Sequence, residues 1–436
     1  MHSKLLRWAG DNGYEFGAHK YSLMHFRSHH KTPVCTLLPN NIPNFGEGRD
    51  ATDPVLKTDT EPMNILGVHV GPRLCWKQHI TIMEAKVARK LRALLRVTGT
   101  TWGRSLHDMR ELYRTTIIPI ITYGCGAWYV DATNEPNRGN LPKYLLQRLE
   151  NLQYSCLMQI SGAFHRTAAK ILEKELFIEP LVVTLARLSI AHRVRSYYDD
   201  DSVHSRLARE ERHSKEEVKT HPYQILDREA CSVERASLAF LRQRKTAEQA
   251  DKDWTNRNKR RKAINVYLEQ WAFFQSAYIW NEYRNSRLLR GGKVCPALDS
   301  DFYAEWDERS LECYQGLTRA QSTMLLHIRT SFIGLNAHLH SIKCSETAYC
   351  PCLRDRHTAK HLLLDCSLLS EQRGALVKAI GHLSFQDMLT KDAFETTRWA
   401  VMHSGMAPWH LAKSDAQSWI STKRKKKGRR QQGGRT

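Results

Sequence analysis

Three cysteines and a histidine lie close together in the last quarter of the 436-residue chain. Cys350 and Cys352 are separated by one residue, His361 follows nine positions later, and Cys366 comes five positions after that. Thiolate and imidazole are the ligands that zinc prefers, and four of them complete its tetrahedral shell. A Cys-x-Cys pair can come from one tight turn, and a His and a Cys five apart can come from a helix that follows. The spacing therefore predicts a zinc site formed by Cys350, Cys352, His361 and Cys366.

Two further side chains in the same stretch compete as ligands. Cys344 offers another thiolate and His357 another imidazole nitrogen, so either could replace one of the four. The alternative to a metal site is a group of reduced cysteines, one of them packed beneath the leucines at 362–364. Three thiols seldom cluster by chance around a histidine at this spacing, which favours zinc. Without the metal, we expect so short a segment to be poorly ordered.

Positive charge is the second feature of the sequence. The chain has 66 Lys and Arg residues against 45 Asp and Glu residues, a formal net charge of 66 − 45 = +21, which predicts a polyanionic partner. Residues 423–436 hold eight of these cations and no acid, which leaves 21 − 8 = +13 for the rest. The candidate phosphate-binding residues of this tail are Lys423, Arg424, Lys425, Lys426, Lys427, Arg429 and Arg430. Such a run is typical of a nuclear import signal or a phosphate-binding arm, and the alternative is a solvated tail without a dedicated partner.

A second group of cations follows helical spacing. Apolar residues recur on one face of the segment, at Ile80, Met83, Val87, Leu91 and Leu94. Five cations share the opposite face and are called here the basic stripe: Lys86, Arg89, Lys90, Arg92 and Arg96. The pattern predicts an amphipathic helix whose outer surface contacts phosphates. A merely solvated helix surface is the alternative, but the charge spread along the chain favours nucleic acid, RNA or DNA.

Cysteine usage and hydropathy indicate the compartment. Eleven scattered cysteines do not form a disulfide framework and suit a reducing interior, nucleus or cytoplasm, rather than secretion. The longest apolar stretch, 117–129, is short and interrupted by Pro119, Gly124 and Gly126, so no segment is expected to span a bilayer. We therefore expect no membrane partner. The oligomeric state stays open.

The elements that must position these residues are mainly helical. The first sixty or so residues mix short apolar runs with turn residues, and 64–70 alternates as a strand would, which predicts a small α/β piece at the N-terminus. Helices are expected at 105–118, 141–160, 167–176 and 180–198. The predicted fold class is mainly α with this small α/β N-terminal piece.

The region after residue 200 predicts a connector. Residues 201–262 are rich in charge of both signs and poor in large apolar groups, which is typical of a solvated helical or partly disordered segment without a core. Farther on, four aromatic residues follow helical spacing: Tyr267, Trp271, Phe274 and Tyr278. Base stacking is conceivable for them, but a packed core face is favoured.

One acidic run invites comparison with a polymerase site. A Tyr followed by paired aspartates, as in 197–201, can hold two magnesium ions for nucleotidyl transfer. Such a site needs a hairpin between apolar strands and a third carboxylate, whereas the residues before this run follow a helical pattern. We interpret it as an acidic helix end and expect no magnesium site in this chain.

Several segments in a fixed order resemble a known family. Residues 5–26 (LLRWAGDNGYEFGAHKYSLMHF) resemble the stretch after the catalytic hairpin in the palm of non-LTR (LINE-type) retrotransposon reverse transcriptases, and 65–80 (ILGVHVGPRLCWKQHI) is similar to the hairpin that closes that palm. Residues 111–129 and 149–181 look like the thumb, and 314–366 is similar to the C-terminal zinc-knuckle region, particularly of fungal elements. The resemblance covers roughly 1–198 and 300–410.

The resemblance implies a domain organisation. Residues 1–80 would form a palm-edge remnant with its closing hairpin, and residues 81–200 would form a helical thumb. A charged helical connector would follow at 201–296. Residues 297–410 would form a helical region that contains the CCHC zinc knuckle at 350–366, and residues 411–436 would form a basic tail. Leu353 occupies a knuckle position where relatives often have Gly, which could distort the first turn without removing a ligand.

The resemblance also implies a function. In the family, the Tyr-x-Asp-Asp hairpin and the earlier metal-binding Asp lie upstream of the matching part, so we expect a nucleic-acid-binding remnant that is catalytically incomplete. Lys20 matches the palm lysine that approaches the incoming triphosphate, and it would be orphaned without the metals. The alternative is an active RNA-directed DNA polymerase that uses Asp199 and Asp200, or one completed in trans by a full-length element.

Overall fold

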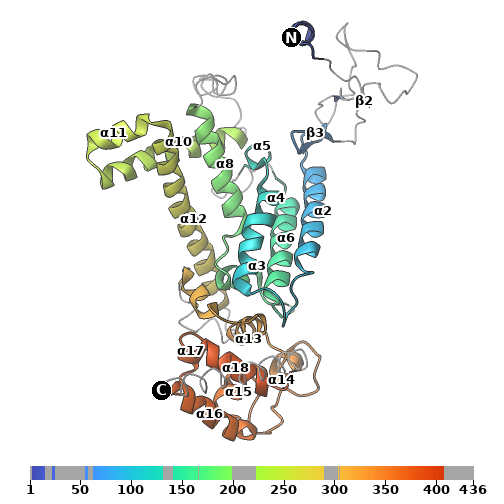
Figure 1. Cartoon of the computed structure of the whole chain (residues 1–436), viewed down its shortest axis with the longest axis vertical. Helices are drawn as coiled ribbons and strands as arrows, with labels where there is room; N and C mark the ends of the chain where they lie inside the picture. Colours follow the sequence, from blue (N-terminus) through green and yellow to red (C-terminus); the bar gives the residue numbers. More distant parts are fainter. Residues whose placement is uncertain are drawn as a thin grey trace, which may run out of the picture. The chain divides into compact units, whose positions relative to one another are not determined.

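The computed structural model describes residues 2–14, 22–24, 55–56, 62–130, 141–164, 166–198, 222–288, 303 and 305–406. The described chain is mainly helical, which confirms the expected class at that level (Figure 1). It divides into two compact units, residues 1–86 and 87–436. None of the helices in the described ranges is long and apolar enough to cross a membrane. The finer divisions at 200, 296 and 410 stay predictions.

The first unit contains a small α/β piece. It consists of helix α1 (His2–Asp11), strand β1 (Ser22–Leu23) paired in parallel with β2 (Val55–Leu56), and β3 (Met63–Ile65) paired antiparallel with β4 (Val68–Val70). The expectation of one strand over 64–70 was wrong, because the chain reverses between β3 and β4. Leu66 and Gly67 both have positive φ, 49° and 87°, which a two-residue type I′ hairpin turn requires. The Gly67 N–H donates to Asn64 Oδ1 at 2.9 Å and stabilises the turn.

Helix α2 (Lys77–Leu94) continues across the boundary between the units. Ile80, Met83, Val87 and Leu91 are buried, while all five residues of the basic stripe are exposed. The predicted amphipathic helix is therefore confirmed, because one period-3.6 face is apolar and the other charged.

A helical body follows, close to the predicted ranges. Its elements are α3 (Leu106–Leu112), the π-helical turn η2 (Tyr113–Ile117), α4 (Ile118–Thr122), α5 (Cys125–Trp128), α6 (Lys143–Ser161), α7 (Ala169–Glu175) and α8 (Leu181–Tyr198). The helix expected to end at 118 instead continues to Thr122. Pro119 has no N–H to donate one turn back, and the chain accommodates this loss by widening into the π-helical turn before it.

The connector has a core, contrary to the expectation for its first part. Residues 222–288 form α10 (Pro222–Arg244), α11 (Ala247–Thr255) and α12 (Arg257–Leu288), and α10 and α12 lie side by side with α8 (Figure 1). The three helices and Val130, which follows α5, share one buried cluster: Val130, Ile190, Ala191, Val194, Leu226, Ala230, Val233, Ile264 and Leu268. Each helix has only a narrow apolar stripe, so the composition looked solvated. The three stripes together bury one another.

The remaining elements surround α13 (Arg319–Thr330), a helix that is buried over its whole length. They are the 3-10 helix η5 (Glu308–Tyr314), α14 (Asn336–Ser341), α15 (Ala359–Leu364), the 3-10 helix η6 (Ser367–Leu369), α16 (Ser370–Ile380), α17 (Phe385–Met388) and α18 (Ala393–His403). A capping box starts α13, because the Thr318 and Gln321 side chains each accept from the other residue's backbone N–H. Helix α13 packs against α18 and α3, so the C-terminal helices and the helical body share one core.

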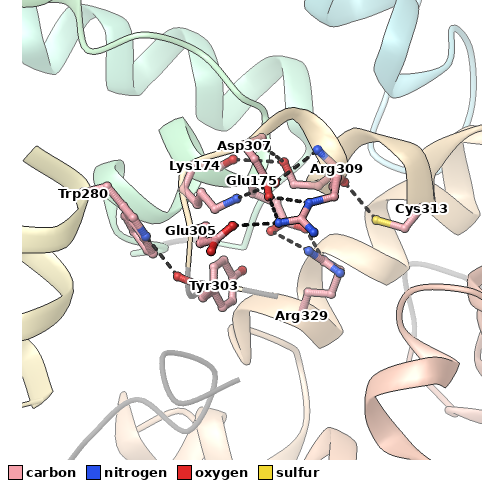
Figure 2. A network of polar contacts seen from close by, with 10 residues as sticks. Lys174, Glu175, Trp280, Tyr303, Glu305, Asp307, Arg309, Cys313 and Arg329 are labelled. Atoms are coloured by element: carbon pink, nitrogen blue, oxygen red, sulfur yellow. Dashed lines mark hydrogen bonds and ion pairs between the residues drawn. The ribbon is translucent and has the colours of Figure 1, made fainter. Parts of the chain in front are cut away.

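A buried polar network joins the same two regions (Figure 2). Arg329 of α13 pairs with Glu175 at the end of α7, and both side chains are almost fully buried. The Tyr314 hydroxyl donates to Glu175 Oε1 at 2.6 Å, and Arg329 Nη1 donates to the Leu389 carbonyl at 3.0 Å. Neighbouring Lys174, also buried, lies 3.6 Å from Asp307 Oδ1. The pairing of Glu175 with Arg329 compensates two charges that would otherwise be costly to bury.

Candidate metal centre

The first two cysteines of the predicted site lie in a tight hairpin. The Leu353 N–H donates to the Cys350 carbonyl at 2.8 Å, which closes a β-turn over the Cys-x-Cys sequence. The flanking residues Tyr349 and Arg356 pair antiparallel, and the Cys350 N–H donates to the Asp355 carbonyl at 2.9 Å. The predicted tight turn is therefore confirmed.

Helix α15 positions the other two ligands. Its N-cap, Thr358, accepts from the His361 N–H at 3.1 Å, which places His361 in the first turn. Cys366 lies just beyond the helix end, where its N–H donates to the His361 carbonyl at 2.9 Å. Arg373 of α16 donates to the Leu364 carbonyl at 2.6 Å and to the Cys366 carbonyl. Residue spacing alone does not indicate this role for Arg373, because the role depends on how α16 packs.

The four ligand atoms converge. They all lie within 4.8 Å of one another, with 3.7 Å between Cys350 Sγ and Cys366 Sγ and 3.2 Å between Cys352 Sγ and His361 Nε2. A tetrahedron with Zn–S bonds of ~2.3 Å and Zn–N bonds of ~2.0 Å has S–S edges of ~3.8 Å and S–N edges of ~3.5 Å. A disulfide would need sulfurs ~2.0 Å apart. The cluster therefore has dimensions that a zinc-sized ion fits, and among the described residues it is the one group of three or more such side chains.

The surroundings of the two hairpin cysteines shift their pKa values in opposite directions. Burial raises the pKa of the Cys350 thiol to about 12, whereas a backbone hydrogen bond from Arg354 lowers the pKa of Cys352 to about 6. His361 Nδ1 is buried and has no hydrogen-bond partner among the described residues, and Asp355 Oδ2 lies 4.0 Å away. A ligating histidine usually turns its second nitrogen toward a carboxylate, and Asp355 is an acidic side chain near Nδ1 but beyond hydrogen-bond distance.

The two competing ligands lie outside the cluster. Cys344 is exposed, and its thiol lies 3.7 Å from the Ile342 carbonyl. His357 Nδ1 accepts from the Asn336 N–H at 3.4 Å, at the start of α14, and burial lowers the pKa of its ring. The structure thus brings together all four predicted ligands, Cys350, Cys352, His361 and Cys366. His357 does not join them, because its ring contacts the backbone of Asn336.

The aromatic residues predicted as a core face are divided between two environments. Tyr267 and Trp271 pack against the core that α8, α10 and α12 share, but Phe274 and Tyr278 are 66% and 63% exposed. The buried row of α12 runs instead through Leu268, Ala272, Ser276 and Trp280. These residues lie four apart, so the buried face follows them and only the first two aromatics adjoin it.

Several predicted residues lie outside the described part of the chain. They are Lys20, the aspartates at 199–201, and the tail residues 423–430. The structure does show that α8 ends at Tyr198, directly before the acidic run.

No protein-family model, curated protein or solved structure matches the chain. The resemblance to LINE-type reverse transcriptases therefore stays a prediction that rests on the segments quoted above.

Proposed function

We propose that the chain is a nucleic-acid-binding protein that holds a structural zinc ion and derives from the C-terminal part of a LINE-type retrotransposon reverse transcriptase. The observation that carries this proposal is the convergence of Cys350, Cys352, His361 and Cys366 at tetrahedral spacing. Four protein ligands would leave no open coordination position, which is the arrangement of a structural rather than a catalytic zinc. The ion would join the hairpin at 349–356 to the end of α15.

Charge along α2 and the loop that follows it supports the nucleic-acid part. Between Ala85 and His107 the chain has six cations, the basic stripe and Arg104, and no Asp or Glu. All six side chains are exposed, so they are free to approach phosphates. Contacts of this kind give affinity that depends on salt rather than on sequence.

We propose further that the chain alone does not polymerise. Nucleotidyl transfer uses magnesium ions held by carboxylates. The one candidate metal cluster in the described ranges contains thiols and an imidazole and no carboxylate. Primer extension on an RNA template checks this point, because template-dependent synthesis by the chain would contradict it.

A salt series tests the binding function. Fluorescence anisotropy of a labelled single strand should show log K falling linearly with log salt, with a slope of about −3.5 if five phosphates are contacted. Arg92→Gln combined with Arg96→Gln should reduce the slope by about 1.4. Lys143→Gln combined with Lys378→Gln is the matched control, because it removes the same charge from exposed positions on α6 and α16. Absence of binding, or affinity that ignores salt, would refute the proposal.

A further inference from the structure

The loop between α2 and α3 presents a large aromatic side chain to solvent. Trp102 is 58% exposed and Val97, at the start of the loop, is 50% exposed. The loop is nevertheless regular, because Thr98 and Gly103 pair antiparallel and the Gly99 N–H donates to the Trp102 carbonyl at 2.9 Å. Gly103 has φ +95°, and a Cβ there would lie 2.4 Å from the Val97 carbonyl. This tight turn therefore requires glycine at 103.

Buried groups fix the loop from below. The Thr98 side chain is 2% exposed, and its hydroxyl lies 3.2 Å from the Trp102 carbonyl. Arg319 of α13, 3% exposed, donates from Nε to the Gly99 carbonyl at 2.8 Å and from Nη1 to the Ile160 carbonyl at 2.7 Å. One buried guanidinium thus ties the loop to the end of α6. Trp102 is held by backbone contacts that do not need its indole.

Gly99 also sets the orientation of the indole. A Cβ on Gly99 would lie 2.3 Å from Trp102 Nε1 and 2.8 Å from Cε2, so the ring packs directly against the glycine backbone. The indole packs against Gly99, and more than half of the Trp102 side chain is exposed. The ring therefore has one orientation and an open surface. An exposed aromatic held in this way loses little conformational entropy when a flat partner stacks on it.

Cations flank this loop along the chain. Arg92 and Arg96 of the basic stripe precede the loop, and Arg104 follows it. Asp108 is the first carboxylate beyond them, and its contact with Arg104 is an exposed pair at 4.0 Å, which offsets little of the charge. An exposed aromatic ring on a loop that exposed cations precede and follow offers both parts of a single-strand site, with bases stacking on the ring and phosphates contacting the cations.

We propose that Trp102 is a stacking site for an unpaired base of an RNA or DNA strand whose phosphates follow the basic stripe. This inference rests on the proposed nucleic-acid binding and assigns it a residue. It favours single strands, because a base inside a duplex has no free face to offer. The inference also separates two contributions to affinity. The arginines supply a contribution that depends on salt, and the indole supplies a contribution that does not.

The experiment compares variants of the full chain on labelled single-stranded RNA, single-stranded DNA and a duplex, each over a salt series. Trp102→Ala should weaken single-strand binding about 5- to 150-fold at every salt concentration, with an unchanged salt slope and little effect on the duplex. Trp102→Phe should lose less, because a smaller ring still stacks. Tyr144→Ala removes an equally exposed aromatic on α6, 53% exposed, and should bind like the unaltered chain.

Tryptophan fluorescence gives a second readout. Single strands should quench the unaltered chain more than they quench Trp102→Phe, and the difference is the signal of residue 102. If Trp102→Ala and Trp102→Phe both bind single strands as the unaltered chain does, the stacking site is refuted while the salt-dependent binding stands. If the unaltered chain binds no strand at all, the proposed function fails and the stacking site with it.

Discussion

Glu175 and Arg329 form an almost completely buried ion pair between α7 and α13 (Figure 2). Burial is the largest influence and by itself would lower the pKa of Arg329, but Glu175 together with Cys313, Tyr314 and Tyr303 reverses it, so the net shift is upward. The Tyr314 hydroxyl occupies one carboxylate oxygen, and the Leu389 carbonyl accepts from the guanidinium. The pair therefore lies in a polar centre where neither charge can lose its partner without a large cost.

Removing one member of this pair should destabilise the protein strongly. Glu175→Gln leaves the Arg329 charge buried and uncompensated, so we expect a loss of about 3–5 kcal/mol in the free energy of unfolding, measured by urea denaturation. Combining it with Arg329→Met should restore part of the loss, because no buried charge remains. Asp251→Asn breaks an exposed pair with Arg242 and should cost about 1 kcal/mol or less. A Glu175→Gln variant as stable as Asp251→Asn would contradict this account.

Metal analysis of the purified chain should find about one zinc ion per molecule. Cys350→Ser should lose it, because three ligands hold zinc far more weakly than four. Cys344→Ser, which alters an exposed thiol outside the cluster, should keep it. A chelator should lower the melting temperature of the unaltered chain and of Cys344→Ser, but not that of Cys350→Ser. If the Cys350→Ser variant still contains zinc, the proposed zinc site is refuted.

Leu353 carries backbone strain beside the proposed zinc site. Its φ is +60° and its side chain is 82% exposed, so it occupies the left-handed region without a packing gain. Leu353→Gly should stabilise the zinc-loaded chain by about 0.5–1 kcal/mol, because glycine relieves a strain of about 1–2 kcal/mol but adds freedom to the unfolded chain.

The control for Leu353→Gly is Leu368→Gly. Leu368 is also exposed, at 62%, but lies in the 3-10 helix η6. Glycine there relieves no strain and should destabilise the chain. Thermal unfolding measures both variants, and a destabilised Leu353→Gly would show that the leucine has a contact worth more than the strain.

Acid should destabilise the fold through His327. The ring is 5% exposed, Nε2 lies 2.8 Å from the Gly162 carbonyl, and burial lowers its pKa to about 4. The unfolded chain binds a proton near pH 6.5 and the folded chain only near pH 4, so the stability is complete above pH 6.5 and falls as the pH drops toward 4. A shift of this size corresponds to about 3 kcal/mol.

Two measurements check this behaviour. NMR titration should find the imidazole of His327 neutral well below pH 6, and a midpoint near 6.5 would refute the prediction. His327→Gln keeps a donor for the Gly162 carbonyl and should flatten the decline in the free energy of unfolding between pH 6.5 and 4. Part of the decline should remain, because burial lowers the pKa of His79 to about 4 as well.

The sequence by itself determined the features that depend on spacing along the chain. The period of Ile80, Met83 and Val87 gave the amphipathic α2, and the positions of Cys350 and Cys352 gave the turn that brings them together. These features could be predicted because a helix period and a tight turn are set by neighbouring residues.

Only the tertiary structure decided the features that need surfaces from distant segments. Leu226 and Ile264 look like isolated apolar residues in a charged region until α8 lies beside them. His357 and Cys344 could not be excluded as ligands until the backbone placed their side chains elsewhere. Trp102 became a candidate site because Arg319, more than two hundred residues away, anchors the loop on which it is exposed. Burial and orientation are set by such partners, and a linear pattern does not contain them.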